Sequence, residues 1–404
     1  MIRSGPRGAP RPIRRAPTLF MPVMVAAFTL LVPPPVRAGD GGVADVTTPM
    51  VVFGYNDLGM HCMNSDFSEL LILPPFNTLH AQVIDRREGE PDIVTSGVTV
   101  SYLIPGNTHS AGKSNFWKYW PATFGPRPPA NVGLTGSRLR GVMTPTGQND
   151  WAVTGIPIVP TDDLGRENPY PLAMIVVRQN GSVVARTQAV VPVSTEMSCN
   201  LCHNTPGIST ARDILQDHDR LHGTTLEGQR PVLCASCHAD AALGLPGQAG
   251  VPNLSSAMHT AHASRVIGLP LVDACYACHP GVRTACQRDV HLSRGLNCTD
   301  CHGDMAAVGA PARAPWVDEP RCGSCHTRAG FDFEEPGRLY RDSRGHKGVH
   351  CAACHGSPHA ITPTITDVDN VQAVSIQGHA GPIDTCTVCH SGGAPGPFFH
   401  SIDD

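Results

Sequence analysis

Between residues 40 and 195, short apolar runs rich in β-branched residues alternate with turn residues. The runs cover residues 50–55, 81–84, 98–104, 151–158, 173–177 and 183–193. Runs of this length, separated by Gly, Pro and Asn, are typical of the strands of an all-β domain. Asn180-Gly181 lies between two Val-rich runs and predicts a two-residue hairpin turn. We therefore expect an N-terminal all-β, sandwich-like domain over residues 39–195, which is long enough to bury its own core.

The pattern changes beyond residue 195, where seven Cys-x-x-Cys-His motifs follow one another. The motifs are Cys199/Cys202/His203, Cys234/Cys237/His238, Cys275/Cys278/His279, Cys298/Cys301/His302, Cys322/Cys325/His326, Cys351/Cys354/His355 and Cys386/Cys389/His390. This spacing is the attachment signature of c-type haem. Both thiols bond to the haem vinyl groups, and the following His ligates the iron from the same side. The chain is therefore predicted to carry seven covalently attached haem c groups, with the motif histidines as proximal ligands.

Alternative chemistries account for less of the cysteine pattern. Structural zinc sites need ligands in sets of four, and they do not require a His directly after each second Cys. A thioredoxin-like redox site has one Cys-x-x-Cys in a βαβ unit. A scaffold held only by disulfides leaves the seven histidines without a role.

The motif-bearing part should have little side-chain core of its own, and the haem faces should supply its apolar interior. Successive motifs are 35, 41, 23, 24, 29 and 35 residues apart, which is too irregular for a solenoid repeat. We expect residues 196–404 to form a haem-dense cytochrome domain of loops and short helices. Its folding should depend on the attached group, as zinc fingers depend on their metal.

Histidines outside the motifs are candidates for the second axial position of each iron. Methionine is scarce in this part of the chain, whereas histidine is plentiful. The candidate distal ligands are His218, His222, His259, His262, His291, His346, His359 and His379. His350 directly precedes a motif cysteine and His400 is near the C-terminal end, so both are placed outside this set. Ligation by two histidines keeps iron six-coordinate and its potential low.

Two short helices should carry four of these candidates. Ser209 can cap a helix over residues 211–221 that ends at Gly223, with His218 and His222 on one face. Ser255 or Ser256 can cap a second helix, which carries His259 and His262.

The first 38 residues have the pattern of a secretory signal peptide. A basic region with five Arg precedes an apolar stretch over residues 19–32, and Val36-Arg37-Ala38 offers a cleavage site. A retained membrane anchor is the alternative, although the apolar stretch is short for a bilayer span. No later stretch is long and apolar enough to span a membrane. We expect an exported protein that is periplasmic, outer-membrane-associated or extracellular. The formal net charge of −4 gives no reason to expect nucleic-acid binding.

Cys62 and Cys286 are the two cysteines outside the motifs. They can form a disulfide in an oxidising compartment or remain as unpaired thiols. Cys62 also stands among Met60, His61 and Met63, which are soft donors that suit copper. Neighbouring residues of a strand point to opposite faces, which disfavours a metal site made of four consecutive residues.

The chain resembles the multihaem c-type cytochromes of bacterial extracytoplasmic electron transfer. The resemblance is carried by the seven motifs and by stretches such as Val232-Leu233-Cys234-Ala235-Ser236-Cys237-His238 and Cys351-Ala352-Ala353-Cys354-His355-Gly356-Ser357-Pro358-His359. The segment from Asn56 to Met63 also looks like the start of a non-haem domain that precedes haem modules in such proteins. The resemblance implies electron transfer to redox partner proteins or extracellular acceptors. Some members of the group assemble into filaments, so a homo-oligomer or filament stays open here.

Two functions remain to be weighed from the sequence. The first is electron transfer through the haems, with no catalytic residue of the chain's own. The second is a multihaem reductase or oxidoreductase that acts on small nitrogen or sulfur oxyanions, which needs one iron with an open position. No motif carries Lys in place of its His, and distal histidines outnumber the haems, so we favour the carrier. The N-terminal domain can in addition serve as a docking domain.

Overall fold

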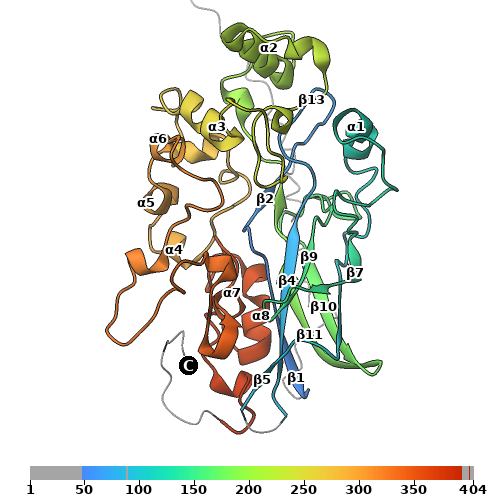
Figure 1. Cartoon of the computed structure of the whole chain (residues 1–404), viewed down its shortest axis with the longest axis vertical. Coiled ribbons are helices and arrows are strands. Elements are labelled where there is room, and N and C mark those ends of the chain that lie inside the picture. The colour runs from blue at the N-terminus through green and yellow to red at the C-terminus, as the bar shows by residue number, and fades with distance from the viewer. Residues whose placement is uncertain (1–47, 88–89, 394–399, 401–404) are drawn as a thin grey trace, which may run out of the picture. The chain divides into compact units, whose positions relative to one another are not determined.

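The computed structural model describes residues 48–87, 90–393 and 400, and two antiparallel sheets form its N-terminal part (Figure 1). The first sheet has the order β1-β4-β9-β8, with β5 also paired to β4; the strands are β1 (Met50–Tyr55), β4 (Thr78–Asp85), β5 (Asp92–Val94), β8 (Thr144–Pro145) and β9 (Trp151–Thr154). The second sheet has the order β11-β10-β6-β7; its strands are β6 (Thr99–Leu103), β7 (Arg140–Val142), β10 (Leu172–Gln179) and β11 (Ser182–Val190). The described residues all belong to one compact unit.

Strand β1 is buried on both faces, which explains why its sequence is apolar without alternation. Met50 and Val52 belong to the core cluster between the two sheets. Val51, Phe53 and Tyr55 point the other way, into a second cluster shared with the motif-bearing part of the chain. Because successive side chains of a strand point to opposite faces, β1 forms part of the middle layer of three.

The third layer is built from helices of the motif-bearing part. Helices α7 (Cys351–His355) and α8 (Asp367–Gln377) lie beside β1 and β11 (Figure 1). Their apolar residues complete the second cluster, to which Ala352, Ala353, Ile376 and Val388 belong. Burial of these side chains therefore joins the N-terminal sheets to the haem-motif segment.

A buried glutamine of β4 adds polar contacts across the same layer boundary. The Gln82 side chain donates to the carbonyl oxygens of Asn149 and Gly348 and accepts from the His350 backbone N–H. Gln82 is fully buried, so the loss of any one of these bonds would leave a polar group unsatisfied.

The predicted hairpin at Asn180-Gly181 is confirmed. β10 and β11 pair in antiparallel fashion, with Gln179 opposite Ser182. Asn180 and Gly181 have φ values of 50° and 83°, the positive φ that both central residues of a type I′ turn require.

Two local features differ from the sequence expectation. The run at 151–158 is a strand only as far as Thr154, because Gly155 takes φ 75° and Pro157 follows. A helix that the apolar pattern did not predict, α1 (Phe116–Thr123), packs Phe116 against Phe67 with ring centroids 5.0 Å apart.

The motif-bearing part consists of short helices, single helical turns and loops. The helices are α2 (Thr210–His222), α3 (Leu254–His262), α4 (Val290–Ser293), α5 (Cys298–His302), α6 (Met305–Val308), α7 and α8. Three two-stranded ladders complete the described structure: β2 (His61–Cys62) with β12 (Val193–Ser194), β3 (Leu70–Leu71) with β13 (Val232–Leu233), and β14 (Arg344–Gly345) with β15 (Val349–His350). The β2–β12 and β3–β13 pairs are parallel.

Helix α2 confirms its predicted caps. The Ser209 side chain accepts from the Arg212 backbone N–H, and Gly223 ends the helix with φ 66°. The predicted cap of α3 is wrong. Asn253 caps this helix by accepting from Ser256 N–H, and Ser255 and Ser256 lie inside it.

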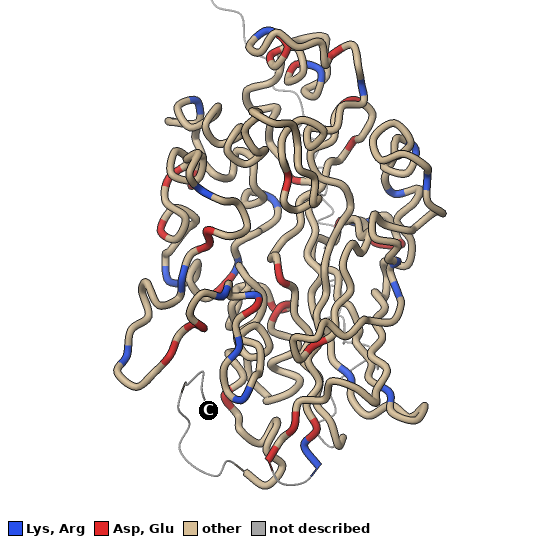
Figure 2. The backbone as a smooth tube through the Cα atoms, in the orientation of Figure 1, with Lys and Arg blue, Asp and Glu red and all other residues tan. Residues whose placement is uncertain are grey.

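The predicted signal peptide, residues 1–38, lies outside the described residues. Within the described ranges, no helix combines the length and the apolarity that a bilayer crossing needs. Figure 2 shows Lys and Arg interspersed with Asp and Glu along the described chain, so neither sign dominates this view.

Candidate haem attachment sites

All seven motifs fold as one helical turn, which begins at the first cysteine in six of them and at Ala274, one residue earlier, in the third. In five of them the His backbone N–H donates to the first Cys carbonyl; these pairs are His203–Cys199 at 2.9 Å, His238–Cys234 at 3.0 Å, His279–Cys275 at 2.8 Å, His326–Cys322 at 2.9 Å and His390–Cys386 at 2.9 Å. The other two motifs form the α-helices α5 and α7. Such a turn brings the two thiols and the imidazole of one motif close together. We number the motifs in chain order as sites 1 to 7.

The motif cysteines differ in how far the chain encloses them. Ten are partly buried and four are exposed; the exposed four are Cys202, Cys301, Cys325 and Cys386.

Two of the exposed cysteines, Cys202 of site 1 and Cys325 of site 5, lie in stretches that are themselves exposed. Each ends its helical turn, with its backbone N–H bonded to the first Cys carbonyl at 3.2 Å. The residues that follow, 204–207 and 326–330, are exposed as well, so little of the chain packs over either thiol. Thioether attachment at Cys202 and Cys325 therefore stays a prediction from the motif, and a haem held there would have one edge at the surface.

Each of the seven motif histidines faces a second histidine from elsewhere in the chain. The ring-centroid distances are 6.3 Å for His203–His262, 6.3 Å for His238–His218, 6.0 Å for His279–His259, 5.9 Å for His302–His359, 6.1 Å for His326–His291, 5.9 Å for His355–His400 and 6.1 Å for His390–His346. The seven distances agree within 0.4 Å although the partners come from helices, turns and loops.

This separation suits one metal ion between two imidazoles. Metal–nitrogen bonds of about 2 Å on opposite sides of an ion place the ring centroids roughly 6 Å apart. Two imidazoles in van der Waals contact would be closer, as the 4.8 Å between His218 and His222 shows. The residues present therefore fit a haem iron with two axial histidines at every site.

Hydrogen bonds at Nδ1 orient many of these rings. The Nδ1 partners are the carbonyl oxygens of Pro252 for His238, Ser255 for His259 and Met258 for His262, and the hydroxyl of Thr224 for His218. Carboxylates lie near Nδ1 of His203, His291 and His390. A carbonyl oxygen can only accept, so Nδ1 of His238, His259 and His262 carries the proton. Nε2 of these three rings is then the unprotonated nitrogen, the one that can bind a metal.

Burial keeps several of the motif histidines neutral. It lowers the pKa of His279, His302 and His355 to about 4 in each case. Neighbouring histidines account for a smaller part of each shift. A neutral imidazole is the form that ligates iron, so these rings need not lose a proton near neutral pH.

Six of the eight predicted distal histidines face a motif histidine: His218, His259, His262, His291, His346 and His359. The two others lie elsewhere. The His222 ring is tilted against that of His218, and His379 Nε2 lies 3.3 Å from an Asp384 carboxylate oxygen. His350, which the sequence left outside the set, contacts the Gln148 carbonyl through Nε2 at 2.7 Å.

His400, also left outside the set, takes the seventh position. Its ring stacks on Phe331 and Phe333 at 6.5 and 5.6 Å, and its Nδ1 contacts the Asp332 carbonyl. It belongs to site 6, 45 residues after His355 in the chain. Sequence spacing could not reveal this pairing, although the aromatic residues at 331 and 333 mark a place where an imidazole can stack.

The seven sites form a row in space, and helices α2 and α3 show which sites are neighbours at one end of it. On α2, an Asp217 carboxylate oxygen lies 3.4 Å from Nδ1 of His203 at site 1, and the next residue, His218, faces His238 of site 2. On α3, His262 faces site 1 and His259 faces site 3. Each helix therefore joins two sites.

The middle sites follow from direct contacts. Sγ of Cys275 at site 3 and Sγ of Cys298 at site 4 lie within 4.8 Å of each other. Sites 4 and 5 are joined by two segments that run side by side, with Arg288 N–H donating to the His359 carbonyl at 2.9 Å. His359 faces site 4, and His291, three residues after Arg288, faces site 5.

The last sites complete a single row. The Phe333 ring lies 5.7 Å from His326 of site 5 and 5.6 Å from His400 of site 6. Ile383 N–H donates to the Cys354 carbonyl at 2.9 Å. Because Ile383 is three residues before Cys386, this bond places site 7 beside site 6. The spatial order is 2-1-3-4-5-6-7. In Figure 1, α2, α3, α5, α4 and α7 follow one another down the view in the same sense.

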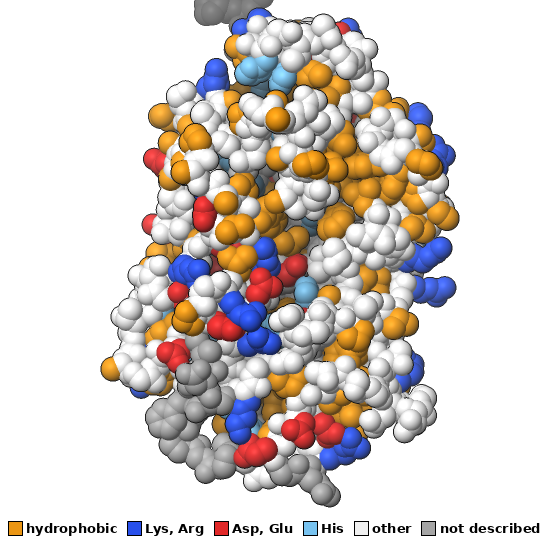
Figure 3. Space-filling view, in the orientation of Figure 1, with side chains coloured by type: hydrophobic (Ala, Val, Ile, Leu, Met, Phe, Trp, Pro, Cys, Tyr) orange, Lys and Arg blue, Asp and Glu red, His pale blue; other side chains and the backbone are white. Residues whose placement is uncertain are grey.

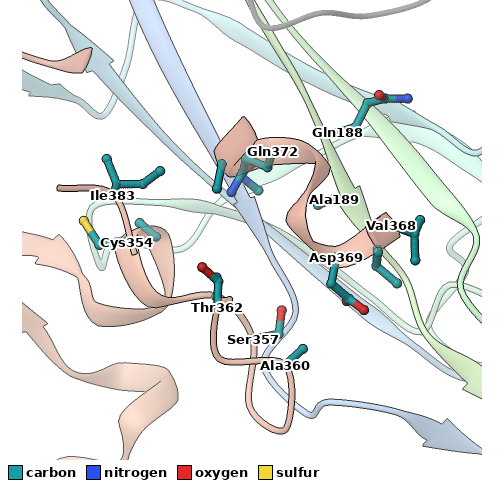
Figure 4. A pocket seen from close by; sticks show the side chains of 15 residues that line it. Gln188, Ala189, Cys354, Ser357, Ala360, Thr362, Val368, Asp369, Gln372 and Ile383 are labelled. Carbon is teal, nitrogen blue, oxygen red and sulfur yellow. The ribbon is translucent and has the colours of Figure 1, made fainter. Parts of the chain in front are cut away.

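A pocket reaches site 6 from the sheet side (Figure 4). It lies between α7, α8, β1 and β11, and Cys354 is at its edge. Two of its polar side chains are engaged, since Gln372 accepts from Gly54 N–H at 2.7 Å and Ser357 accepts from Asn56 N–H at 2.8 Å. The buried hydroxyl of Thr362, which also lines the pocket, has no hydrogen-bond partner among the described residues.

A cluster of ionisable groups with little exposure surrounds His80 of β4 and Tyr55 of β1, beside the segment that leads to site 6. His80 Nδ1 is 2.8 Å from Asp150 Oδ2, and its Nε2 is 3.5 Å from Asp57 Oδ2. Burial by itself lowers the pKa of His80, but the two carboxylates more than offset this and raise the pKa to about 9. Tyr55 stacks on His80 at 5.4 Å and donates to Asp150 at 3.1 Å.

The soft donors at residues 60–63 do not converge. His61 Nε2 contacts the Pro74 carbonyl at 2.8 Å, and Met63 belongs to the core between the sheets. Cys62 and Cys286 are both present as free thiols, without a disulfide.

Comparisons with models of protein families, with curated proteins and with solved structures found no match to this chain.

Proposed function

We propose that this chain is an exported electron-transfer protein with seven covalently attached c-type haems, each held between two histidines. The observation that carries the proposal is the set of seven histidine pairs with centroid distances of 5.9–6.3 Å. Each pair contains one histidine of a Cys-x-x-Cys-His motif and one from outside the motifs.

The haem would supply one-electron chemistry at its iron, with a low potential under two histidine ligands. The chain's own residues supply the rest. Motif cysteines fix the position of each group, the histidine pairs set its axial ligands, and the Nδ1 hydrogen bonds hold the imidazoles in orientation. None of these roles requires a substrate-binding residue.

The row of sites supports a carrier with two ends. Site 2 and site 7 are the first and last members of the row, and the other five lie between them. Figure 3 shows histidine side chains at the surface over α2, the helix that serves site 2. Cys386, the first cysteine of site 7, is also exposed. Redox partner proteins or extracellular acceptors would therefore meet the chain at these two ends.

Exposure alone does not mark the ends of the row. Cys202 and Cys325 are exposed too, yet they belong to sites 1 and 5, which have a neighbouring site on either side. Position in the row is what distinguishes sites 2 and 7, because an electron that enters at one of them passes every other site before it leaves at the other.

The alternative is a reductase that acts on small nitrogen or sulfur oxyanions. Such an enzyme needs an iron with a free coordination position. Because a second histidine faces every motif histidine, the arrangement favours the carrier over the enzyme.

Spectra of the ferric holoprotein, with carbon monoxide added to the reduced form, separate the two functions. The carrier predicts low-spin signals from all seven haems and no rapid binding of carbon monoxide. A high-spin fraction near one seventh, with carbon monoxide bound at one haem, would support the enzyme.

A further inference from the structure

Cys62 and Cys286 lie on opposite sides of a tight junction between the N-terminal part and the motif-bearing part. Cys62 is in β2, where it stands opposite Ser194 of β12. The Ser194 and Thr284 hydroxyl oxygens are 2.7 Å apart, and Thr284 is two residues before Cys286. The β2–β12 ladder thus brings Cys62 toward the loop that carries Cys286.

A second set of contacts brings the same two segments together. The Met60 backbone N–H donates to the Cys286 thiol. Gly59 packs so closely on the loop at 358–359 that a Cβ atom there would lie 2.8 Å from the Pro358 carbonyl oxygen and 3.0 Å from His359 Nδ1. Cys286 Sγ lies 3.8 Å from the same Nδ1. The thiol of Cys286 therefore sits between the segment leading to Cys62 and an axial histidine of site 4.

A buried glutamate holds the Cys286 loop in place. The Glu196 carboxylate accepts backbone N–H bonds from Val282, Arg283 and Thr284 at 2.8, 3.0 and 2.5 Å. Glu196 follows β12 by two residues, so the loop is tied to the ladder that contains Cys62. Burial raises the pKa of the Cys62 thiol, and the neighbouring Cys286 raises it further.

We propose that Cys62 and Cys286 form a reversible disulfide that joins β2 to the 280–286 loop and changes the surroundings of His359. The co-reactant is an external disulfide, either a small-molecule disulfide or that of a thiol oxidoreductase. One cysteine thiolate attacks a sulfur of that disulfide, which forms a mixed disulfide and releases one external thiol. The other cysteine then attacks the mixed disulfide and releases the second external thiol. Two thiols and one external disulfide become one protein disulfide and two external thiols. Both cysteines are half-buried, so small adjustments give access.

This inference rests on the proposed function only where it concerns His359. With Nε2 on iron, His359 Nδ1–H would donate to the Cys286 sulfur, as axial histidines commonly donate to a second group. A disulfide sulfur is a weaker acceptor than a thiol or thiolate. Loss of that hydrogen bond makes the imidazole a weaker donor to ferric iron, so the potential of site 4 should rise.

Counting reactive thiols in the denatured holoprotein tests the disulfide. Fourteen of the sixteen cysteines would be thioethers and would not react with an alkylating agent. We expect two labels after reduction, none after incubation with oxidised glutathione, and a peptide that links Cys62 to Cys286. Two labels after that incubation would overturn the disulfide. More than two labels after reduction would instead contradict haem attachment, so the two failures are distinguishable.

A pair of variants tests the effect on His359. Cys62→Ser removes the disulfide but keeps the Cys286–His359 contact, whereas Cys286→Ser removes both. In a redox titration, oxidised glutathione should raise one potential of seven in the wild type and none in Cys62→Ser. An equal rise in both proteins would overturn the proposed link. If Cys62→Ser does not fold, the peptide map of the wild type still decides the disulfide.

Discussion

His203 Nδ1 lies 3.4 Å from a carboxylate oxygen of Asp217, one residue before the histidine that faces the next site. The pair couples the orientation of His203, the proposed axial ligand of site 1, to the helix that carries the histidine of site 2. Axial histidines that donate to a carboxylate are stronger metal ligands.

Asp217→Asn should raise the potential of one haem without changing the number of haems, because a neutral amide is a weaker acceptor for Nδ1–H. A redox titration followed by visible absorption measures the change. The matched control is Asp384→Asn, since Asp384 contacts His379, which lies outside the seven histidine pairs. Equal shifts in both variants would contradict the specific role of Asp217.

His400→Ala should leave one iron with a single axial histidine. We expect about one seventh of the ferric haem to become high-spin, and the reduced protein to bind one carbon monoxide per chain. His379→Ala should leave all seven haems low-spin. A fully low-spin spectrum in His400→Ala, or a high-spin fraction in His379→Ala, would show that the assignment of the distal ligand is wrong.

Arg288 and Asp369 form a buried ion pair that holds the segments of sites 4 and 5 together. Arg288 Nε and Asp369 Oδ2 are 2.6 Å apart, and the Arg288 side chain is fully buried. Arg288→Met leaves the carboxylate without its partner and should lower the free energy of unfolding by about 3–5 kcal/mol. The double variant Arg288→Met with Asp369→Leu should recover part of the loss. Urea unfolding of the holoproteins measures both, and a double variant no more stable than Arg288→Met would contradict the stabilising role of the pair.

His80 predicts a dependence of stability on pH. Its folded-state pKa of about 9 lies above the ordinary value of 6.5, so its protonated form stabilises the fold. This stabilisation, roughly 3 kcal/mol, is fully present below about pH 6.5 and is lost as the pH rises through 9. The wild type should therefore lose more stability than His80→Gln between about pH 6 and pH 10. Parallel curves for the two proteins would contradict the raised pKa.

The sequence predicts the local chemistry of the sites because each motif is a short-range feature. Seven Cys-x-x-Cys-His turns, the caps of α2 and the Asn180-Gly181 hairpin depend on neighbouring residues. The structure shows each of them as a turn, a cap or a hairpin. The chemistry of attachment itself stays a prediction.

The pairing of distal histidines depends on contacts between residues far apart in the chain. His222 and His218 are both on α2, one helical turn apart. The His222 ring nevertheless lies beside His218 and does not face a motif histidine. His400 reaches site 6 by stacking on Phe333, which spacing does not encode. The exposure of Cys202 and Cys325 is likewise set by which segments pack over a turn, and not by the motif.

The intact mass of the mature protein, made in a host that attaches c-type haem, tests the central claim most directly. The account predicts the polypeptide mass plus seven haem groups, which persist under denaturing conditions because fourteen cysteines hold them. A mass equal to the bare polypeptide, with the motif cysteines open to alkylation, would contradict it.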